Sequence, residues 1–135
     1  MSLSDEERRI IVSREFQKGL QFMKQAEANA EIEIWDVVAN RLYYSVFHAV
    51  SALLIKDGHK VGTHKGVVMM FGMYYVKTGL VTEDEGSLYS QLQTMREKAD
   101  YNCAFEAKEK DIKYMMPLAK SLLDKVRTLI GENIE

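Results

Sequence analysis

The stretch from Ile34 to Lys56 constrains the fold more than any other part of this sequence. Apolar side chains recur there at helical spacing and cover most of a helix's circumference: Trp35, Val38, Ala39, Leu42, Tyr43, Val46, Phe47, Val50, Leu53 and Leu54. A helix that is apolar on so many sides must be surrounded by other elements. The sequence therefore predicts a central helix over 34–56 with the rest of the chain packed around it.

Four further helices are predicted from periodicity and from start and stop signals. They are expected from Ser4 to about Asn29, from His64 to about Lys77, from Thr82 through Cys103, and from about Ala107 to Ile130. Capping-box spacing marks two of the starts, and Pro117 should kink the last helix or begin a new one. The fold class is all-α, an up-and-down bundle of four main helices plus a shorter fifth.

The size and composition of the chain favour one ordinary helical domain over residues 1–135, with its core at about 5–131. A chain of 135 residues closes one core, and a net charge of −2 gives no overall attraction to nucleic acid. Cys103 is the single cysteine, and no Cys/His cluster indicates a metal, so neither a metal nor another cofactor is expected. The charged start and the lack of a long apolar run predict a cytoplasmic protein without membrane contact.

The central helix carries a polar stripe within its apolar surface. Arg41, Ser45 and His48 are spaced i, i+4 and i+7, so they project from one side of the helix, with Tyr44 at the edge. One interpretation pairs these side chains with internal partners, as is usual for buried polar groups. The other makes the stripe a contact for phosphate or RNA.

A second polar group lies at the end of the fourth predicted helix. Arg96 and Asp100 are i, i+4 neighbours, and Tyr101 follows. The planar guanidinium suits phosphate, although the same pair on a solvated face would be an ordinary surface ion pair.

His64 and Lys65 begin the third helix and belong to the only basic cluster in a loop, with Lys56, His59 and Lys60. Free backbone N–H groups at a helix start attract anions. The alternative is a solvated charged surface.

Three runs of sequence together resemble the HEPN domain, in particular its branch of small bacterial and archaeal proteins. They are NRLYYSVFH ending at His48, HKG starting at His64, and REKADY from Arg96 to Tyr101. The likeness extends from roughly Phe16 to Leu129. It implies a helical bundle that pairs as a homodimer, and a minimal nucleotidyltransferase as partner in a toxin–antitoxin module.

The active branches of the HEPN family are metal-independent endoribonucleases with an R-x4-6-H motif on a late helix. Arg96 matches the arginine of that motif, but Asp100, Tyr101 and Asn102 occupy the place of the histidine. Arg41 and His48 have R-x6-H spacing on the central helix and are the candidates for a displaced site. The predicted catalytic residues are thus Arg41, His48 and Arg96, and the predicted nucleotide- or RNA-binding residues are Arg41, Tyr44, Ser45, His64, Lys65, Arg96, Asp100 and Tyr101.

Two functions remain open at this point. The first is an RNA- or nucleotide-binding protein, with or without ribonuclease activity, and it predicts that Arg41, His48 and Arg96 converge on an open cleft. The second is a non-catalytic dimeric partner of a nucleotidyltransferase that adenylylates Tyr101. It predicts that Arg41 and His48 are sealed inside the bundle with internal partners.

Overall fold

The computed structural model describes residues 3–131 of the chain. Within that range it contains α1 (Asp5–Glu31), α2 (Trp35–Lys56), α3 (His64–Phe71), the π-helical turn η1 (Gly72–Val76), α4 (Glu83–Tyr101) and α5 (Glu109–Ile130), and no strand. The prediction of an all-α fold is confirmed.

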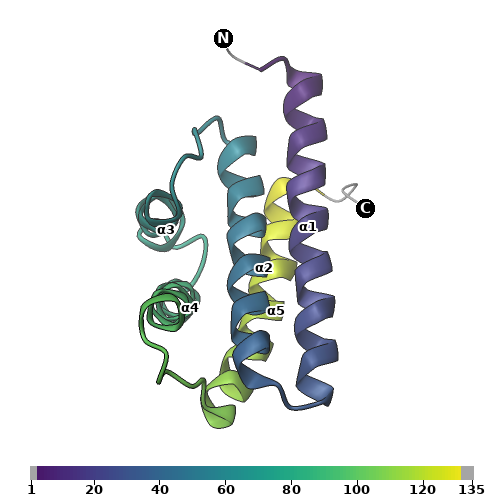
Figure 1. Cartoon of the computed structure of the whole chain (residues 1–135). Coiled ribbons are helices and arrows are strands. Elements are labelled where there is room, and N and C mark those ends of the chain that lie inside the picture. The colour runs from purple at the N-terminus through teal and green to yellow at the C-terminus, as the bar shows by residue number, and fades with distance from the viewer. Residues whose placement is uncertain (1–2, 132–135) are drawn as a thin grey trace.

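The helix α2 lies in the middle of the molecule. The helices α1, α2 and α5 run alongside one another, whereas α3 and α4 lie on the other side of α2 and are seen almost end-on in Figure 1. Most of α2 is buried accordingly, and Leu42, Tyr43 and Val46 are fully inaccessible to solvent. The predicted central helix is therefore confirmed, with α1 and α5 covering one part of its surface and α3 and α4 another.

A glycine allows α1 to approach α2 closely. A Cβ atom on Gly19 would lie 2.9 Å from the backbone oxygen of Ser45, a distance that real Cβ atoms do not reach. Ser45 is fully buried there, and its hydroxyl donates a 2.7 Å hydrogen bond to the backbone oxygen of Gly19. Ser45 thus joins two helices beneath the surface, where the structure shows an internal partner and not the predicted ligand contact.

We expect Gly19→Ala to destabilise the fold, because the added methyl group meets backbone atoms that a side-chain rotation cannot move away. Overpacking should outweigh the better helix propensity of alanine and lower the free energy of unfolding by about 1–2 kcal/mol, measured in urea. Gly72→Ala is the matched control, since Gly72 also has helical dihedrals and a Cβ there meets nothing within 4 Å. A Gly19→Ala protein as stable as the wild type would show that the two helices separate without cost.

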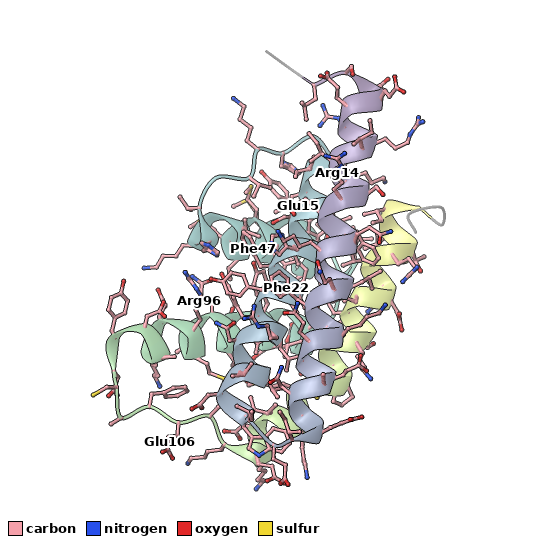
Figure 2. The ribbon with its side chains drawn as sticks, turned by 45° about the vertical axis from the view of Figure 1, so that its right-hand side comes forward. Arg14, Glu15, Phe22, Phe47, Arg96 and Glu106 are labelled. Carbon is pink, nitrogen blue, oxygen red and sulfur yellow. The ribbon has the colours of Figure 1, made fainter. Side chains whose placement is uncertain are left out.

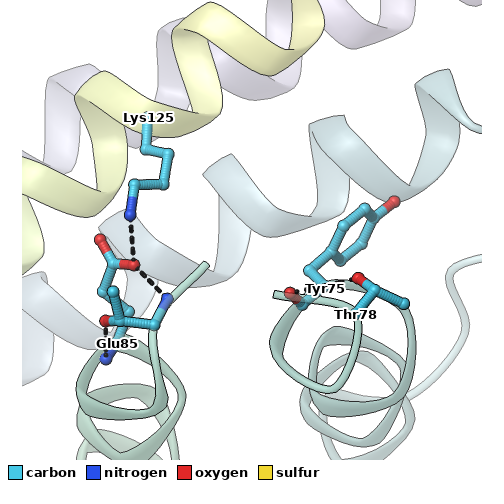
Figure 3. Close-up of polar contacts among 5 residues, drawn as sticks. Tyr75, Thr78, Glu85 and Lys125 are labelled. Atoms are coloured by element: carbon cyan, nitrogen blue, oxygen red, sulfur yellow. Dashed lines mark hydrogen bonds and ion pairs between the residues drawn. The ribbon is translucent and has the colours of Figure 1, made fainter. Parts of the chain in front are cut away.

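An ion pair between a buried carboxylate and a half-exposed lysine connects α4 to α5. Glu85 is 3% exposed, and its carboxylate accepts hydrogen bonds from the Lys125 ammonium at 2.8 Å and from the Thr82 backbone N–H at 2.7 Å (Figure 3). Burial alone would raise the pKa of Glu85, but the hydrogen bonds from Lys125 and Thr82 outweigh it and lower the pKa. One carboxylate therefore caps α4 and attaches it to α5.

Lys125→Met should destabilise the protein by about 2 kcal/mol, because it leaves a buried carboxylate with only its capping hydrogen bond. Since the folded pKa of Glu85 is lowered by Lys125, the stability from this pair is present above the unfolded pKa of Glu85 and is lost as the pH falls through the folded value. Lys120→Met is the control, because the Lys120–Glu27 pair is exposed and such pairs contribute about 0–1 kcal/mol. Thermal unfolding at pH 7 and pH 3 measures both effects, and equal losses in the two variants would contradict the assignment.

Two helix ends differ from the prediction. The helix α4 ends at Tyr101, so Cys103 lies beyond it and is exposed instead of facing the core. The helix α5 begins at Glu109 and continues through Pro117, so the helix does not restart at that proline. The Pro117 side chain is exposed. Solvent can hydrate the carbonyl group that loses its usual donor at Pro117, and this reduces the cost of the interruption.

Residues 3–131 contain neither a membrane-spanning helix nor a metal-binding group of side chains. No helix there is both long enough and apolar enough to cross a membrane. The same residues contain no group of three or more His, Cys, Asp or Glu side chains arranged to hold a metal ion.

Candidate functional site

Four aromatic rings on α1 and α2 form a continuous set, which we call the aromatic cluster: Phe22, Tyr43, Tyr44 and Phe47. Ring centroids are 5.7 Å apart for Phe22 and Tyr44, 5.0 Å for Tyr43 and Tyr44, and 6.1 Å for Tyr43 and Phe47. Only Tyr43 is buried, and the other three rings are half-exposed. Figure 2 shows Phe22 and Phe47 on the face of the molecule that also carries Glu15 and Arg96.

His48 is held against this cluster by an acidic side chain of α1. Its Nδ1 lies 2.7 Å from Oε2 of Glu15, and its ring stacks on Phe22 with an interplanar angle of 6°. A carboxylate accepts and does not donate, so Nδ1 carries a proton and the lone pair of neutral His48 is on Nε2. The His48 side chain is 16% exposed, so this arrangement sits at the edge of the surface.

The two predicted arginines cover different rings of the same cluster. The guanidinium carbon of Arg41 lies 5.3 Å from the centroid of Phe22. That of Arg96 lies 5.3 Å from Tyr43 and 5.8 Å from Tyr44. Cation–π contacts at such distances orient the side chains and leave the N–H edges able to bind an anion.

His64 reaches the cluster from the start of α3. Its ring stacks on Phe47 at 4.4 Å, and Nδ1 lies 2.6 Å from the Tyr43 hydroxyl. Burial, followed by the charge of Arg96 and the proximity of His48, lowers the pKa of His64. Burial also raises the pKa of Tyr43 to about 12, so the hydroxyl keeps its proton and donates it to Nδ1, which leaves the N–H of neutral His64 on Nε2.

We expect the pKa of His64 to lie below 6.5 in the folded protein and to rise toward that value in Arg96→Ala. The folded state then binds fewer protons than the unfolded state, so the stability from neutral His64 is present above about pH 6.5 and decreases as the pH falls below it. Titration of the imidazole resonances by NMR measures both the value and its change. A His64 pKa unaltered by the loss of Arg96 would mean that the guanidinium does not act on this ring.

The structure brings together some of the predicted site residues and leaves others apart. Arg41, Tyr44, His48, His64 and Arg96 share the aromatic cluster. Lys65 lies beside it in a 3.8 Å ion pair with Glu97, and Asp100 is exposed one turn beyond Arg96. Tyr101 is 89% exposed, with no hydrogen bond or ring contact to any described residue.

The basic cluster expected between Lys56 and Lys65 is divided in the structure. His64 faces the aromatic cluster, whereas His59 stacks on Tyr74 at 4.2 Å. Lys56 lies 3.9 Å from the carboxylate of Asp57.

Sequence reasoning missed Glu15, Phe22 and Phe47 as site residues. Glu15 had a usable signal, because it follows Val12 by three positions and precedes Gly19 by four, on the side of the first helix that faces the core. The two sequence interpretations of the polar stripe each describe part of the result. Arg41 and His48 do have internal contacts, yet both remain partly exposed at one surface, His48 by 16% of its side chain.

Comparison with known proteins identifies the family of the chain. A sequence model of the HEPN domain matches residues 12–129, which include all five predicted site residues on the aromatic cluster. The chain therefore belongs to the HEPN domain family, and the resemblance seen in the sequence is confirmed.

Several curated proteins are similar over most of the chain. A UPF0332 protein of Thermotoga maritima is 36% identical over 93 residues, which cover 69% of this chain and 70% of that protein. Two proteins of Methanocaldococcus jannaschii are named "Putative toxin MJ0142" and "Putative toxin MJ0605". They are 30% and 32% identical, over 82% and 72% of this chain and 78% and 71% of their own lengths.

Proposed function

We propose that this chain is the toxin component of a HEPN/nucleotidyltransferase pair and that it binds and cleaves RNA without a metal ion. The observation that carries the proposal is the convergence of Arg41, His48 and Arg96 on one aromatic cluster, with His48 oriented by Glu15. The names of the two archaeal relatives support the toxin role. Half-exposed rings beside arginines suit single-stranded RNA, whose bases stack on aromatic side chains.

The proposed reaction uses the side chains of the cluster. Arg41 and Arg96 hold the phosphate, and Nε2 of His48 takes the proton of the 2′-hydroxyl group. The 2′-oxygen then attacks phosphorus, and the bond from phosphorus to the 5′-oxygen breaks. The 5′-oxygen takes a proton from water, which leaves a 2′,3′-cyclic phosphate and a 5′-hydroxyl end.

The partners belong to the same proposal. A homodimer and a minimal nucleotidyltransferase are the expected partners of a HEPN protein of this branch, acting in the cytoplasm. Dimerisation would add the same cluster from a second copy, and the transferase would act as antitoxin.

The test is cleavage of a mixed RNA pool by the purified protein in EDTA. We expect the wild type to cleave, His48→Ala to lose about 100-fold or more of the rate as general bases do, and Arg96→Ala to lose activity through phosphate binding. Glu15→Gln should lower the rate less than His48→Ala does, because the amide still accepts a hydrogen bond from Nδ1.

His59→Ala is the matched control, since His59 stacks on Tyr74 away from the cluster. Each variant is checked for folding by thermal unfolding. Absence of cleavage by the wild type, or equal losses in His48→Ala and His59→Ala, would contradict a ribonuclease site at the cluster.

A second candidate is the non-catalytic partner, and the exposure of Tyr101 favours it. A side chain that is 89% exposed at the end of a helix, without hydrogen bonds or ring contacts to residues 3–131, is accessible to a modifying enzyme. In that case a nucleotidyltransferase with ATP would add one AMP to the wild type and none to Tyr101→Phe, measured by mass spectrometry. Tyr114→Phe is the control, since Tyr114 is also exposed, at 64%.

A further inference from the structure

A pocket of about 170 Å³ lies beside the aromatic cluster, between the start of α2, the end of α4 and the segment 102–105. Its wall includes Asp36, Asn40, Arg96, Asp100 and Phe105. We propose that this pocket binds one purine base with an exocyclic amino group, next to the phosphate that Arg96 holds. The assignment of the base to RNA rests on the proposed function, whereas the binding of the base itself does not.

Arg96 connects the pocket to the phosphate site. The same side chain lines the pocket and lies over Tyr43 and Tyr44. The base would thus lie on one side of the Arg96 guanidinium group and the phosphate on the other, whether both belong to one nucleotide or to two adjacent nucleotides of the RNA. Pockets for drug-sized ligands have volumes of about 300–1,000 Å³, so a smaller pocket suits one ring system while the rest of the nucleotide stays outside.

Asn40 is a polar side chain of this pocket without a protein partner. It is half-buried and makes no hydrogen bond to any described residue. A half-buried carboxamide without a protein partner keeps its donors and its acceptor available to a ligand in the pocket. Asn40 stands one turn before Tyr44 in the NRLYYSVFH run, and the cleavage chemistry gives it no task.

The other polar groups of the pocket define the ligand. Oδ1 of Asp36 accepts the Ala107 backbone N–H at 2.6 Å, which fixes that carboxylate against the loop before α5. Asp36 and Asp100 are both acceptors when ionised, so they favour N–H donors and repel a phosphate. The phosphate therefore stays with Arg96, and the acids face the base.

A purine with an amino group satisfies these side chains best. The carboxamide of Asn40 offers one donor and one acceptor, the combination that pairs with a purine edge. The carboxylates accept from the exocyclic amino group, and half-buried Phe105 contacts the face of the base. A purine carries polar atoms along two edges and so reaches more of the wall than a pyrimidine does.

The test uses AMP, GMP, IMP, purine riboside monophosphate and CMP as probes; calorimetry measures their affinities in every variant, and the Asn40 side-chain amide resonances locate the bound base in the wild type by NMR. We expect AMP or GMP to shift these resonances and to bind about ten-fold more tightly than the analogue lacking its amino group, which is purine riboside monophosphate for AMP and IMP for GMP. These two comparisons show which amino group is recognised. Asn40→Ala should remove the ten-fold preference, and Gln21→Ala should keep it, because the exposed Gln21 side chain lines a different surface pocket, with Arg14 and Lys24.

Each further outcome has a definite meaning. Equal binding of AMP, GMP, IMP, purine riboside monophosphate and CMP, or a preference retained in a folded Asn40→Ala protein, would overturn the pocket assignment. Cleavage of RNA together with unshifted Asn40 resonances would also overturn it, while leaving the ribonuclease proposal intact. Purine binding with the expected preference, but without any RNA cleavage, would support the pocket and contradict the proposed function.

Discussion

The close contact between α1 and α2 at Gly19 and Ser45 is the constraint on which the rest of this structure depends. Because α1 has no side chain at that point, its backbone lies against α2, and a buried hydroxyl fixes the two helices in register. One turn earlier this register puts Glu15 beside His48, and one turn later it puts Phe22 under Arg41. Core packing and the candidate site are thus built by the same contact.

The two histidines of the site receive different partners from the helices around α2. His48 faces a carboxylate of α1, whereas His64 faces a hydroxyl group that lies under a guanidinium of α4. The carboxylate beside His48 leaves the free lone pair of the neutral ring on Nε2. The hydroxyl that donates to Nδ1 of His64 leaves the proton of that neutral ring on Nε2. One aromatic cluster therefore presents a proton acceptor and a hydrogen-bond donor to the same surface.

Much of the fold follows from local sequence signals. Both expected capping boxes, Ser4 with Glu7 and Thr82 with Glu85, are present and start α1 and α4. These signals act within four residues, so they can be read without knowledge of tertiary structure. The end of α4 at Tyr101 was not predictable in this way. The loop that follows is held to α2 by the hydrogen bond between Asp36 and Ala107, which are far apart in the sequence, and the helical spacing of apolar residues up to Cys103 does not reveal that contact.

The site was predictable only in part for the same reason. Helical spacing groups Arg41, Ser45 and His48 on one side of α2, but it does not state which of them a neighbouring helix covers. Ser45 is under α1, and its two neighbours are at the edge. Glu15 is 33 positions before His48, and their pairing arises only when the helices pack.

The link between Glu85 and Lys125 affects the order in which the helices gain their mutual contacts during synthesis of the chain. Arg96 lies on α4, and α4 is attached to α5 through the buried carboxylate of Glu85. A ribosome releases α5 after all the other helices, so α1 to α4 can pack on one another first, and α4 gains its link to Lys125 last. Full support for the helix that carries Arg96 therefore waits until translation has passed Lys125.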